Sequence, residues 1–400
     1  MAAIPRLLNL ILSLGYRIPT ENIKLDYIKG AIWAVFLGFT ILIWPVRSQD
    51  KKALLVIWTV KCFVMLGLML FYEHHYPLDA FGYFAGARYD MSEWVALEIS
   101  GTSSPVAFIA WLHHHSLFNS YHAAKVSFGM IGLVAIYVFY RAVVSFLRQE
   151  KIRLLYILAI FPSILFWSSI LGKEPIVLFG IALYCYGTVR WIRESLWQSV
   201  IILLIGILIV VAIRSWMGVI LSIPLLTVTV ICFNKKHMTS KIVTILLLVG
   251  IILMCVNNVR TSSGIKSRED VRMVANKKVI DFTRGGSAIG NKKEAKTSSA
   301  MPIDTEQVIS FNREMDIFYA IPKGMFTALF RPLPGEANNL FGLLAGIESA
   351  FLLILFGISM NRMRWRKLLD PVIVWAILLI VLWAAAYGFI SYNLGTVCRY

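Results

Sequence analysis

The chain has 400 residues, of which 58% are hydrophobic and 15% charged, with a mean hydropathy of +0.72. A water-soluble domain of this size could not hide so much apolar surface in one core, because the buried fraction rises only slowly with chain length. The composition therefore excludes a water-soluble globular protein, and the continuous apolar runs exclude a β-barrel, whose strands alternate with period two.

The net charge of +17 does not by itself indicate a nucleic-acid partner. Part of it reflects the excess of Lys and Arg that membrane proteins carry in cytoplasmic connections. The sequence has no GxxxxGKS/T or GxGxxG signature, so we expect neither nucleic acid nor a nucleotide-sugar donor. The five cysteines lie in or beside apolar segments without a CxxC pair, which indicates small apolar residues and not metal ligands or disulfides.

The hydropathy pattern predicts an all-α, polytopic integral membrane protein with about ten transmembrane helices and two large extracytoplasmic loops. The expected spans are residues 30–46, 54–72, 125–146, 154–171, 175–189, 199–213, 217–233, 242–256, 340–359 and 371–390.

Four regions follow from this pattern. Residues 1–29 form an amphipathic N-terminal segment, expected on the cytoplasmic side. Its apolar part, Ile4–Leu14, has no cleavage site after it and is expected to lie in the membrane interface. Residues 30–256 form a bundle of about eight helices with an outward loop at 73–124. Residues 257–339 form a basic extracytoplasmic loop with an interfacial segment, and residues 340–400 hold the last two helices.

Alternate connections are basic. This alternation predicts that they face the cytoplasm, and the N-terminus is expected there too. The basic connections are Arg47–Lys52, Arg141–Arg153, Arg190–Ser195, Asn234–Lys241 and Asn361–Asp370.

Lys173 and Glu174 interrupt the apolar stretch Phe161–Gly180. We interpret this stretch as a tight outer hairpin, with Gly172 at the turn and Pro175 in the first turn of the next helix. The two charges either mark a solvated turn or line an outward cavity, since charges at the membrane boundary are costly and often functional. Lys61, within the second span, is expected to snorkel toward an interface.

The outward loop 73–124 interleaves acids with aromatic residues, a mixture typical of an interfacial saccharide site. Its candidate site residues are Asp79, Tyr83 and Arg88. Residues Pro105–Leu117 are expected to form a short interfacial helix. The consecutive histidines in it cannot all point the same way, so we do not expect a metal site from them alone.

The second loop has ten Lys or Arg against four Asp or Glu between Arg260 and Lys296. It is either a solvated loop with incidental charge or a surface that attracts anionic headgroups or a phosphate-bearing substrate. In its apolar second half, Arg331 would be costly without a partner, and Glu336 lies within reach across a proline-rich turn.

Four segments, DAFGYFAGA, FPSILFWSSILGKEP, FRPLPGEANNLFGLLAGIE and YNLGTVCRY, together resemble polytopic proteins of bacterial exopolysaccharide and O-antigen gene clusters. These are GT-C-like glycosyltransferases or polysaccharide polymerases. The resemblance implies a location in the bacterial inner membrane, and Asp79 looks like the catalytic aspartate that GT-C enzymes carry in the first outward loop.

The function expected from these features is glycosyl transfer on the extracytoplasmic face, with a polyprenyl-(pyro)phosphate-linked sugar as donor. The alternatives are a repeat-unit polymerase or a lipid-linked saccharide transporter. The partners expected are that lipid-linked saccharide, membrane lipids and other polysaccharide-assembly proteins. The sequence does not identify a cofactor, and a divalent cation is the candidate. Asp79 and Glu336 are the expected catalytic carboxylates, and the expected substrate-binding residues are Arg88, Lys173, Glu174, Arg214, Arg331 and Tyr83.

Overall fold

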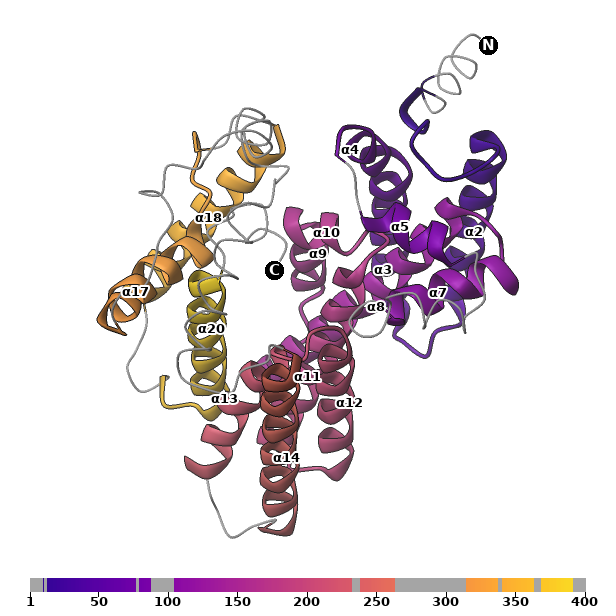
Figure 1. Ribbon diagram of the computed structural model, residues 1–400. Helices are drawn as coiled ribbons and strands as arrows, with labels where there is room; N and C mark the ends of the chain where they lie inside the picture. Colours follow the sequence, from indigo (N-terminus) through magenta and orange to yellow (C-terminus); the bar gives the residue numbers. More distant parts are fainter. Residues whose placement is uncertain are drawn as a thin grey trace. The chain divides into compact units, whose positions relative to one another are not determined.

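The computed structural model describes residues 10, 13–76, 79–87, 104–231, 238–262, 314–336, 340–362 and 368–390. Within these residues every regular element is a helix, which confirms the expected all-α fold class (Figure 1). Seven helices of the described part are long and apolar enough to cross a membrane, as a multi-pass membrane protein requires. They are Ile23–Ile43, Ser48–His75, Tyr121–Leu147, Lys173–Glu194, Met238–Asn258, Phe341–Arg362 and Pro371–Gly388.

The chain divides into two compact units, Met1–Ser215 and Trp216–Tyr400, called unit 1 and unit 2 below. The helices of unit 1 are α2 (Ile23–Ile43), α3 (Ser48–Phe63), the π-helical turn η1 (Val64–Leu68), α4 (Met69–His75), α5 (Asp79–Gly86), α7 (Ser104–His115), α8 (Tyr121–Leu147), α9 (Ile152–Ile160), α10 (Pro162–Trp167), α11 (Lys173–Glu194) and α12 (Trp197–Ile213). Those of unit 2 are α13 (Met217–Ile231), α14 (Met238–Ser262), α17 (Glu314–Phe330), α18 (Leu340–Arg362) and α20 (Pro371–Ile390).

Two of the expected spans are shorter helices and one is broken. Helices α12 and α13 have 17 and 15 residues, fewer than the roughly 20 that cross a bilayer without tilt or thinning. The expected span 154–171 is divided into α9 and α10, because Pro162 forces Phe161 out of the helical region, to φ −56° and ψ 121°. Neither half is long enough to span the bilayer, so the expectation of one continuous helix there is wrong.

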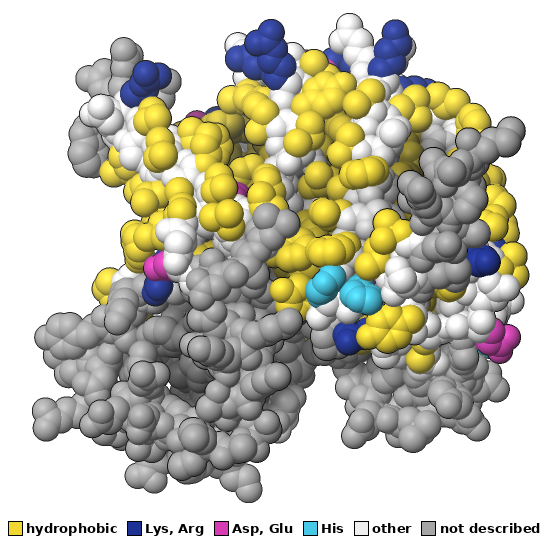
Figure 2. All heavy atoms as spheres, turned by 90° about the horizontal axis from the view of Figure 1, so that it is seen from above, with side chains coloured by type: hydrophobic (Ala, Val, Ile, Leu, Met, Phe, Trp, Pro, Cys, Tyr) yellow, Lys and Arg dark blue, Asp and Glu magenta, His cyan; other side chains and the backbone are white. Residues whose placement is uncertain are grey.

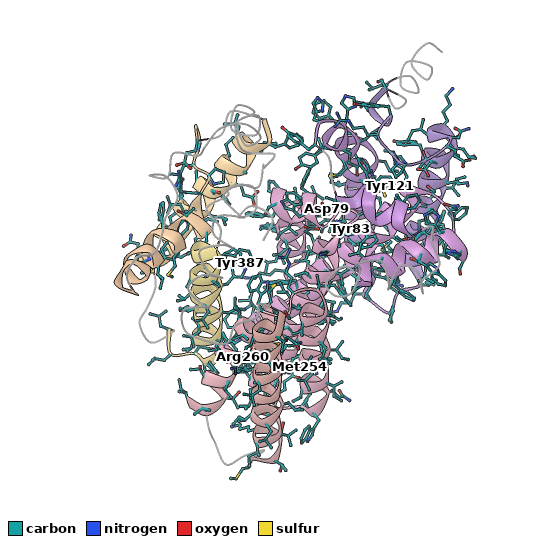
Figure 3. The ribbon with its side chains drawn as sticks, in the orientation of Figure 1. Asp79, Tyr83, Tyr121, Met254, Arg260 and Tyr387 are labelled. Atoms are coloured by element: carbon teal, nitrogen blue, oxygen red, sulfur yellow. The ribbon has the colours of Figure 1, made fainter. Side chains whose placement is uncertain are left out.

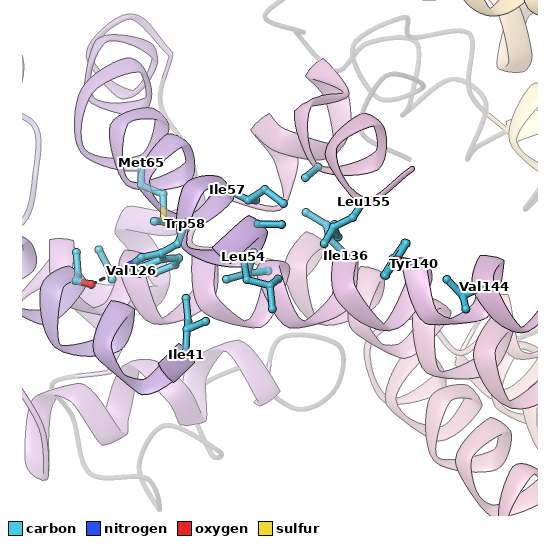
Figure 4. Packing of buried hydrophobic residues seen from close by; sticks show 14 residues of the cluster. Ile41, Leu54, Ile57, Trp58, Met65, Val126, Ile136, Tyr140, Val144 and Leu155 are labelled. Atoms are coloured by element: carbon cyan, nitrogen blue, oxygen red, sulfur yellow. Dashed lines mark hydrogen bonds between the residues drawn. The ribbon is translucent and has the colours of Figure 1, made fainter. Parts of the chain in front are cut away.

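The core of unit 1 lies where α2, α3, α8 and α9 pack together (Figure 4). Trp58 is buried at its centre and donates its indole N–H to the carbonyl oxygen of Ala34, 2.9 Å away. Ile41, Leu54 and Leu155 fill the space around it. This bond satisfies the polar end of the largest side chain in an otherwise apolar interior.

Close helix contacts in both units depend on glycine. At Gly206 of α12, an added side-chain carbon would come within 2.5 Å of the backbone nitrogen of Tyr184 on α11. In unit 2, Gly324 of α17 and Gly388 of α20 leave no room for a side-chain carbon on either residue. Small residues let the backbones approach, which is how helices associate in lipid.

Apolar side chains also cover much of the described surface (Figure 2). Ile43, Phe63 and Leu246 are 82%, 75% and 65% exposed, although each lies in or at the end of a spanning helix. Such exposure would be unfavourable in water, but it suits side chains that face lipid.

The basic connections of unit 1 meet at one end of its helices. At one end, Arg47 and Arg141 both pair with Glu150, and the guanidinium of Arg193 lies 5.4 Å from the ring centroid of Phe146. Three of the basic connections that the sequence placed on the same side of the membrane therefore lie at the same end of this unit.

The other end of unit 1 holds the start of α2. Asp26 on α2 binds the first residues of α8, and His74 at the end of α4 contacts the carbonyl oxygen of Leu14. Residues 13–26 therefore lie at the same end of unit 1 as the end of α4 and the start of α8, opposite the connection Arg47–Lys52. If α2 crosses the membrane, the residues before it and the basic connections face opposite sides, so the expectations that both are cytoplasmic are incompatible.

Candidate functional site

Helix α5 sets the position of Asp79. The carboxylate is exposed on the first residue of the helix, and Tyr83 follows one turn later on the same face (Figure 3). Ala80 and Phe84 lie on a neighbouring face, roughly 100° around the helix, and are buried. The helical spacing in DAFGYFAG therefore leaves the carboxylate exposed while these two residues pack.

Aromatic contacts hold α5 in place. The rings of Phe81 and Phe84 each lie 5.6 Å from the ring of Tyr121, which begins α8. Phe84 also stacks near His114 of α7, 4.4 Å away, and the His114 Nε2 lies 3.0 Å from the Phe84 carbonyl oxygen. The position of Asp79 thus depends on the first residue of α8.

The turn between α10 and α11 has the form expected from the sequence. Gly172 is the residue before the helix, and Lys173, Glu174 and Pro175 form the first turn of α11. A side-chain carbon on Gly172 would lie 2.5 Å from Glu174 Oε2, so the glycine makes room for that carboxylate. An acid in the first turn also meets the positive end of the helix dipole.

Five of the sequence-predicted residues come together in unit 1. Lys173 Nζ lies 6.0 Å from the ring centroid of Tyr83, which is one turn from Asp79 on α5. Glu174 follows Lys173 at the start of α11, and Arg214 ends α12, which packs antiparallel against α11. We call these five residues the Asp79 cluster. Two carboxylates and two cations beside one aromatic ring can bind a polar, partly anionic group at the end of the apolar helices.

Of the other predicted residues, Arg88 is outside the described residues. Arg331 and Glu336 belong to unit 2, where Nη2 of the guanidinium lies 2.7 Å from Glu336 Oε1 and Nε lies 2.9 Å from the same oxygen. This confirms the expected contact across the proline-rich turn.

Glu336 is tightly held. Besides Arg331, the backbone N–H of Leu333 donates to Glu336 Oε2 over 2.8 Å. The Arg331 guanidinium lowers the pKa of the Glu336 carboxyl. A general base works best with a pKa near the working pH, so this pairing favours a structural role for Glu336.

Sequence reasoning missed a set of buried ionisable residues in unit 1. Asp26 accepts hydrogen bonds from the backbone N–H groups of Tyr121 and His122, at 2.9 and 3.2 Å, and from His122 Nδ1 at 2.5 Å. Its carboxylate thus satisfies N–H groups that the first turn of α8 cannot satisfy within the helix. Glu73 binds Lys125 Nζ at 2.9 Å and the Tyr121 hydroxyl at 2.8 Å.

This network holds the residue on which α5 rests. Tyr121 is bound by Asp26 through its backbone and by Glu73 through its hydroxyl, and its ring contacts α5. The sequence did contain a signal, because Asp26, Glu73 and Lys125 all adjoin or enter apolar windows. Windows chosen by hydropathy begin or end at charges, so Asp26 and Glu73 fell outside the expected spans and Lys125 became the first residue of one.

The snorkelling expected of Lys61 is wrong. Lys61 lies halfway along the 28-residue helix Ser48–His75 and is completely buried. Its ammonium lies 3.1 Å from the Ser168 carbonyl oxygen, 2.5 Å from Ser168 Oγ and 3.0 Å from Ser169 Oγ. A cation here meets the carbonyl end of α10, where the helix dipole favours positive charge.

The three consecutive histidines lie on α7, which confirms the short helix expected there. His113 contacts Ser127 Oγ and the Phe118 carbonyl oxygen, His114 contacts Phe84, and His115 contacts the Trp111 carbonyl oxygen. Burial lowers the pKa of His113. In the part of the chain that the structure describes, no group of three His, Cys, Asp or Glu is arranged to hold a metal ion.

Comparison of the chain with models of protein families, with curated proteins and with solved structures finds no match.

Proposed function

We propose that this protein transfers a sugar from a polyprenyl-(pyro)phosphate carrier to an acceptor hydroxyl at the extracytoplasmic face of a bacterial cytoplasmic membrane. The observation that supports this best is the Asp79 cluster, in which an exposed carboxylate on α5 lies one turn from the aromatic ring that Lys173 contacts at the start of α11. A lipid-linked sugar would present its phosphate at this depth while its tail stays in lipid.

The cluster contains the groups that the reaction needs. Asp79 takes the proton of the acceptor hydroxyl, whose oxygen bonds to the anomeric carbon as the bond from that carbon to the phosphate oxygen breaks. Lys173 and Arg214 stabilise the charge that develops on the leaving phosphate. Arg214 suits this role because its planar guanidinium matches two phosphate oxygens at once. Tyr83 offers a ring on which a sugar can rest.

The charge pattern of the connections supports a reaction on the extracytoplasmic face. If the basic connections at Arg47–Lys52 and Arg190–Ser195 face the cytoplasm, the Asp79 cluster faces outward. Nucleotide sugars are cytoplasmic donors, whereas lipid-linked sugars are used outside. The lack of a nucleotide-binding signature in the sequence agrees with a lipid-linked donor. Repeat-unit polymerisation in polysaccharide assembly would use the same groups on a longer substrate.

One observation favours a second candidate, transport of the lipid-linked saccharide. Lys61 is a buried cation at the middle of a spanning helix, and it contacts a broken helix. Buried mid-span charges and discontinuous helices are typical of transporters. The other buried charges of unit 1 lie near helix ends, as Asp26 and Lys125 do.

Transfer is tested with the purified full-length chain in liposomes that hold a radiolabelled polyprenyl-phosphate sugar and an acceptor glycolipid. We expect Asp79→Asn to lower transfer by about 100-fold or more, because the amide cannot take the proton. Glu194→Gln is the matched control, since it removes an acid at the opposite end of α11. Wild-type transfer in Asp79→Asn would contradict the proposal, and label crossing the bilayer without any transfer would favour transport.

A further inference from the structure

Unit 1 contains a cavity of about 480 Å³ beside the buried Asp26–His122 pair. Its walls come from the start of α2, from α5, and from the end of α7 with the connection to α8. The residues that line it include Thr20, Glu21, Lys29, Phe84, His115 and Asn119. Its volume lies within the range of small-molecule sites.

The chemistry of the walls favours a neutral, hydroxyl-rich ligand. Glu21 and Lys29 supply opposite charges, the carboxylate of the third charged wall residue, Asp26, is bound to Tyr121 and His122, and Thr20 and Asn119 supply uncharged polar groups. The Thr20 hydroxyl oxygen is buried and has no hydrogen-bond partner in the structure. A buried hydroxyl without a partner costs free energy unless a ligand or water binds it. Walls of mixed charge do not select for an anion or for a cation.

A flat aromatic surface adds to these polar groups. The His115 ring stacks on the Trp111 ring, with centroids 4.8 Å apart and planes 25° apart. The pyranose ring of a sugar carries an apolar face that packs on aromatic surfaces, while its hydroxyls bind side chains at its edge.

The walls are held in place before any ligand binds. Asp26 is fixed by three hydrogen bonds from Tyr121 and His122. His114 contacts the Phe84 carbonyl oxygen, and Lys29 Nζ lies 3.4 Å from the Asn119 carbonyl oxygen. A rigid cavity loses little conformational entropy on binding, which increases affinity.

The cavity and the Asp79 cluster lie against neighbouring faces of α5. Phe84 lines the cavity, whereas Tyr83, the residue before it, and Asp79, one turn earlier, lie roughly a third of a turn around the same helix. A helix with its side chains is about 10 Å across. A saccharide of two or three units held in the cavity could therefore extend around the helix toward Tyr83 and Asp79.

We infer that this cavity binds a neutral saccharide and serves as the acceptor subsite. The inference rests on the proposed function, since it names the second substrate of the same transfer. The Asp79 cluster would hold the phosphate of the donor, and the cavity would hold sugar units of the acceptor behind the reacting hydroxyl.

The test is saturation-transfer NMR on the full-length chain in lipid nanodiscs, with methyl glycosides of glucose, galactose and N-acetylglucosamine as probes. We expect a transferred signal from at least one glycoside. His115→Ala should reduce that signal by roughly fivefold, as the loss of a stacking surface does. Thr20→Val, which removes a hydroxyl without changing the shape of the side chain, should also reduce it.

The chain offers a matched control. His75 is exposed and its Nδ1 lies 2.9 Å from the carbonyl oxygen of Phe71, four residues earlier, as His115 Nδ1 lies 3.1 Å from that of Trp111. His75 does not line the cavity, so His75→Ala should leave the signal unchanged. Thermal unfolding of each variant shows whether a lost signal reflects a lost fold.

Three results would overturn the inference: no signal from any glycoside, a full signal in both His115→Ala and Thr20→Val, or loss of the signal on adding inorganic phosphate, which would assign the cavity to an anion. The results that would contradict the proposed transfer reaction differ from these three. Glycoside binding without any sugar transfer would contradict the transfer reaction, and transfer without glycoside binding would contradict this subsite alone.

Discussion

At the residue scale, the burial of Glu73 and Lys125 requires an explanation, since moving either ion out of water costs several kcal/mol. Their side chains are 1% and 0% exposed, and they form a 2.9 Å ion pair. The pair is completed by the Tyr121 hydroxyl, so both oxygens of Glu73 are used. Neither charge is left without a partner, which is the condition under which buried pairs persist.

We therefore expect Lys125→Met to destabilise unit 1 by about 3–5 kcal/mol, because it leaves the Glu73 carboxylate buried and unpaired. The double variant Lys125→Met with Glu73→Gln should recover most of that loss. Glutamine is uncharged and still accepts the Tyr121 hydroxyl hydrogen bond. Thermal unfolding in detergent compares the two, and a double variant no more stable than Lys125→Met would contradict this account.

At the element scale, the break between α9 and α10 is stabilised by a residue far away in the sequence. Ser168 ends α10, and its carbonyl oxygen and hydroxyl both contact Lys61 of α3. Only three residues separate Ser168 from Gly172, which precedes α11. Lys61 is thus a positioning residue for the turn that carries Lys173 and Glu174, although it touches neither.

Replacing Lys61 with methionine should loosen this turn selectively. Met has a similar length but cannot donate to the Ser168 carbonyl oxygen, which then lacks its partner in an apolar interior. We expect backbone amides in residues 161–174 to exchange hydrogen at least about tenfold faster, an effect of roughly 1.4 kcal/mol, while those of α12 do not change. Lys51→Met is the control, because Lys51 also donates to a carbonyl oxygen, that of Leu42, but near the surface. Equal amide hydrogen-exchange rates in Lys61→Met and the wild type would contradict the positioning role of Lys61.

At the scale of the whole molecule, local apolar patterns predicted the helices well. Each of the ten expected windows overlaps a helical segment of the described chain, because an apolar run in lipid must satisfy its own backbone hydrogen bonds. Seven helices of the described part are long and apolar enough to span, so the expected number of ten crossings stays a prediction. The break at Pro162 was not predicted, although the restriction that proline places on the preceding residue was visible in the sequence.

The candidate site was predicted only in part, for a physical reason. Asp79 and Lys173 are exposed or half-buried polar residues at helix ends, and hydropathy marks such positions directly. The Asp26–His122 and Glu73–Lys125 pairs depend on contacts between residues 96 and 52 positions apart. Periodicity along the chain contains no information on such distant partners.

The orientation of unit 1 gives the last prediction. Ser13 lies before α2 in the segment that contacts the end of α4, and Ser48 begins α3 at the basic end. Both serines are exposed, and cysteine is close to serine in size. If the basic end faces the cytoplasm, a membrane-impermeant maleimide should label Ser13→Cys but not Ser48→Cys in intact spheroplasts, and should label both after permeabilisation. The unmodified chain, with its five native cysteines, gives the background. The reverse pattern would place the Asp79 cluster in the cytoplasm and exclude an extracytoplasmic lipid-linked donor, whereas labelling of both in intact spheroplasts would contradict the separation of the two ends across the membrane.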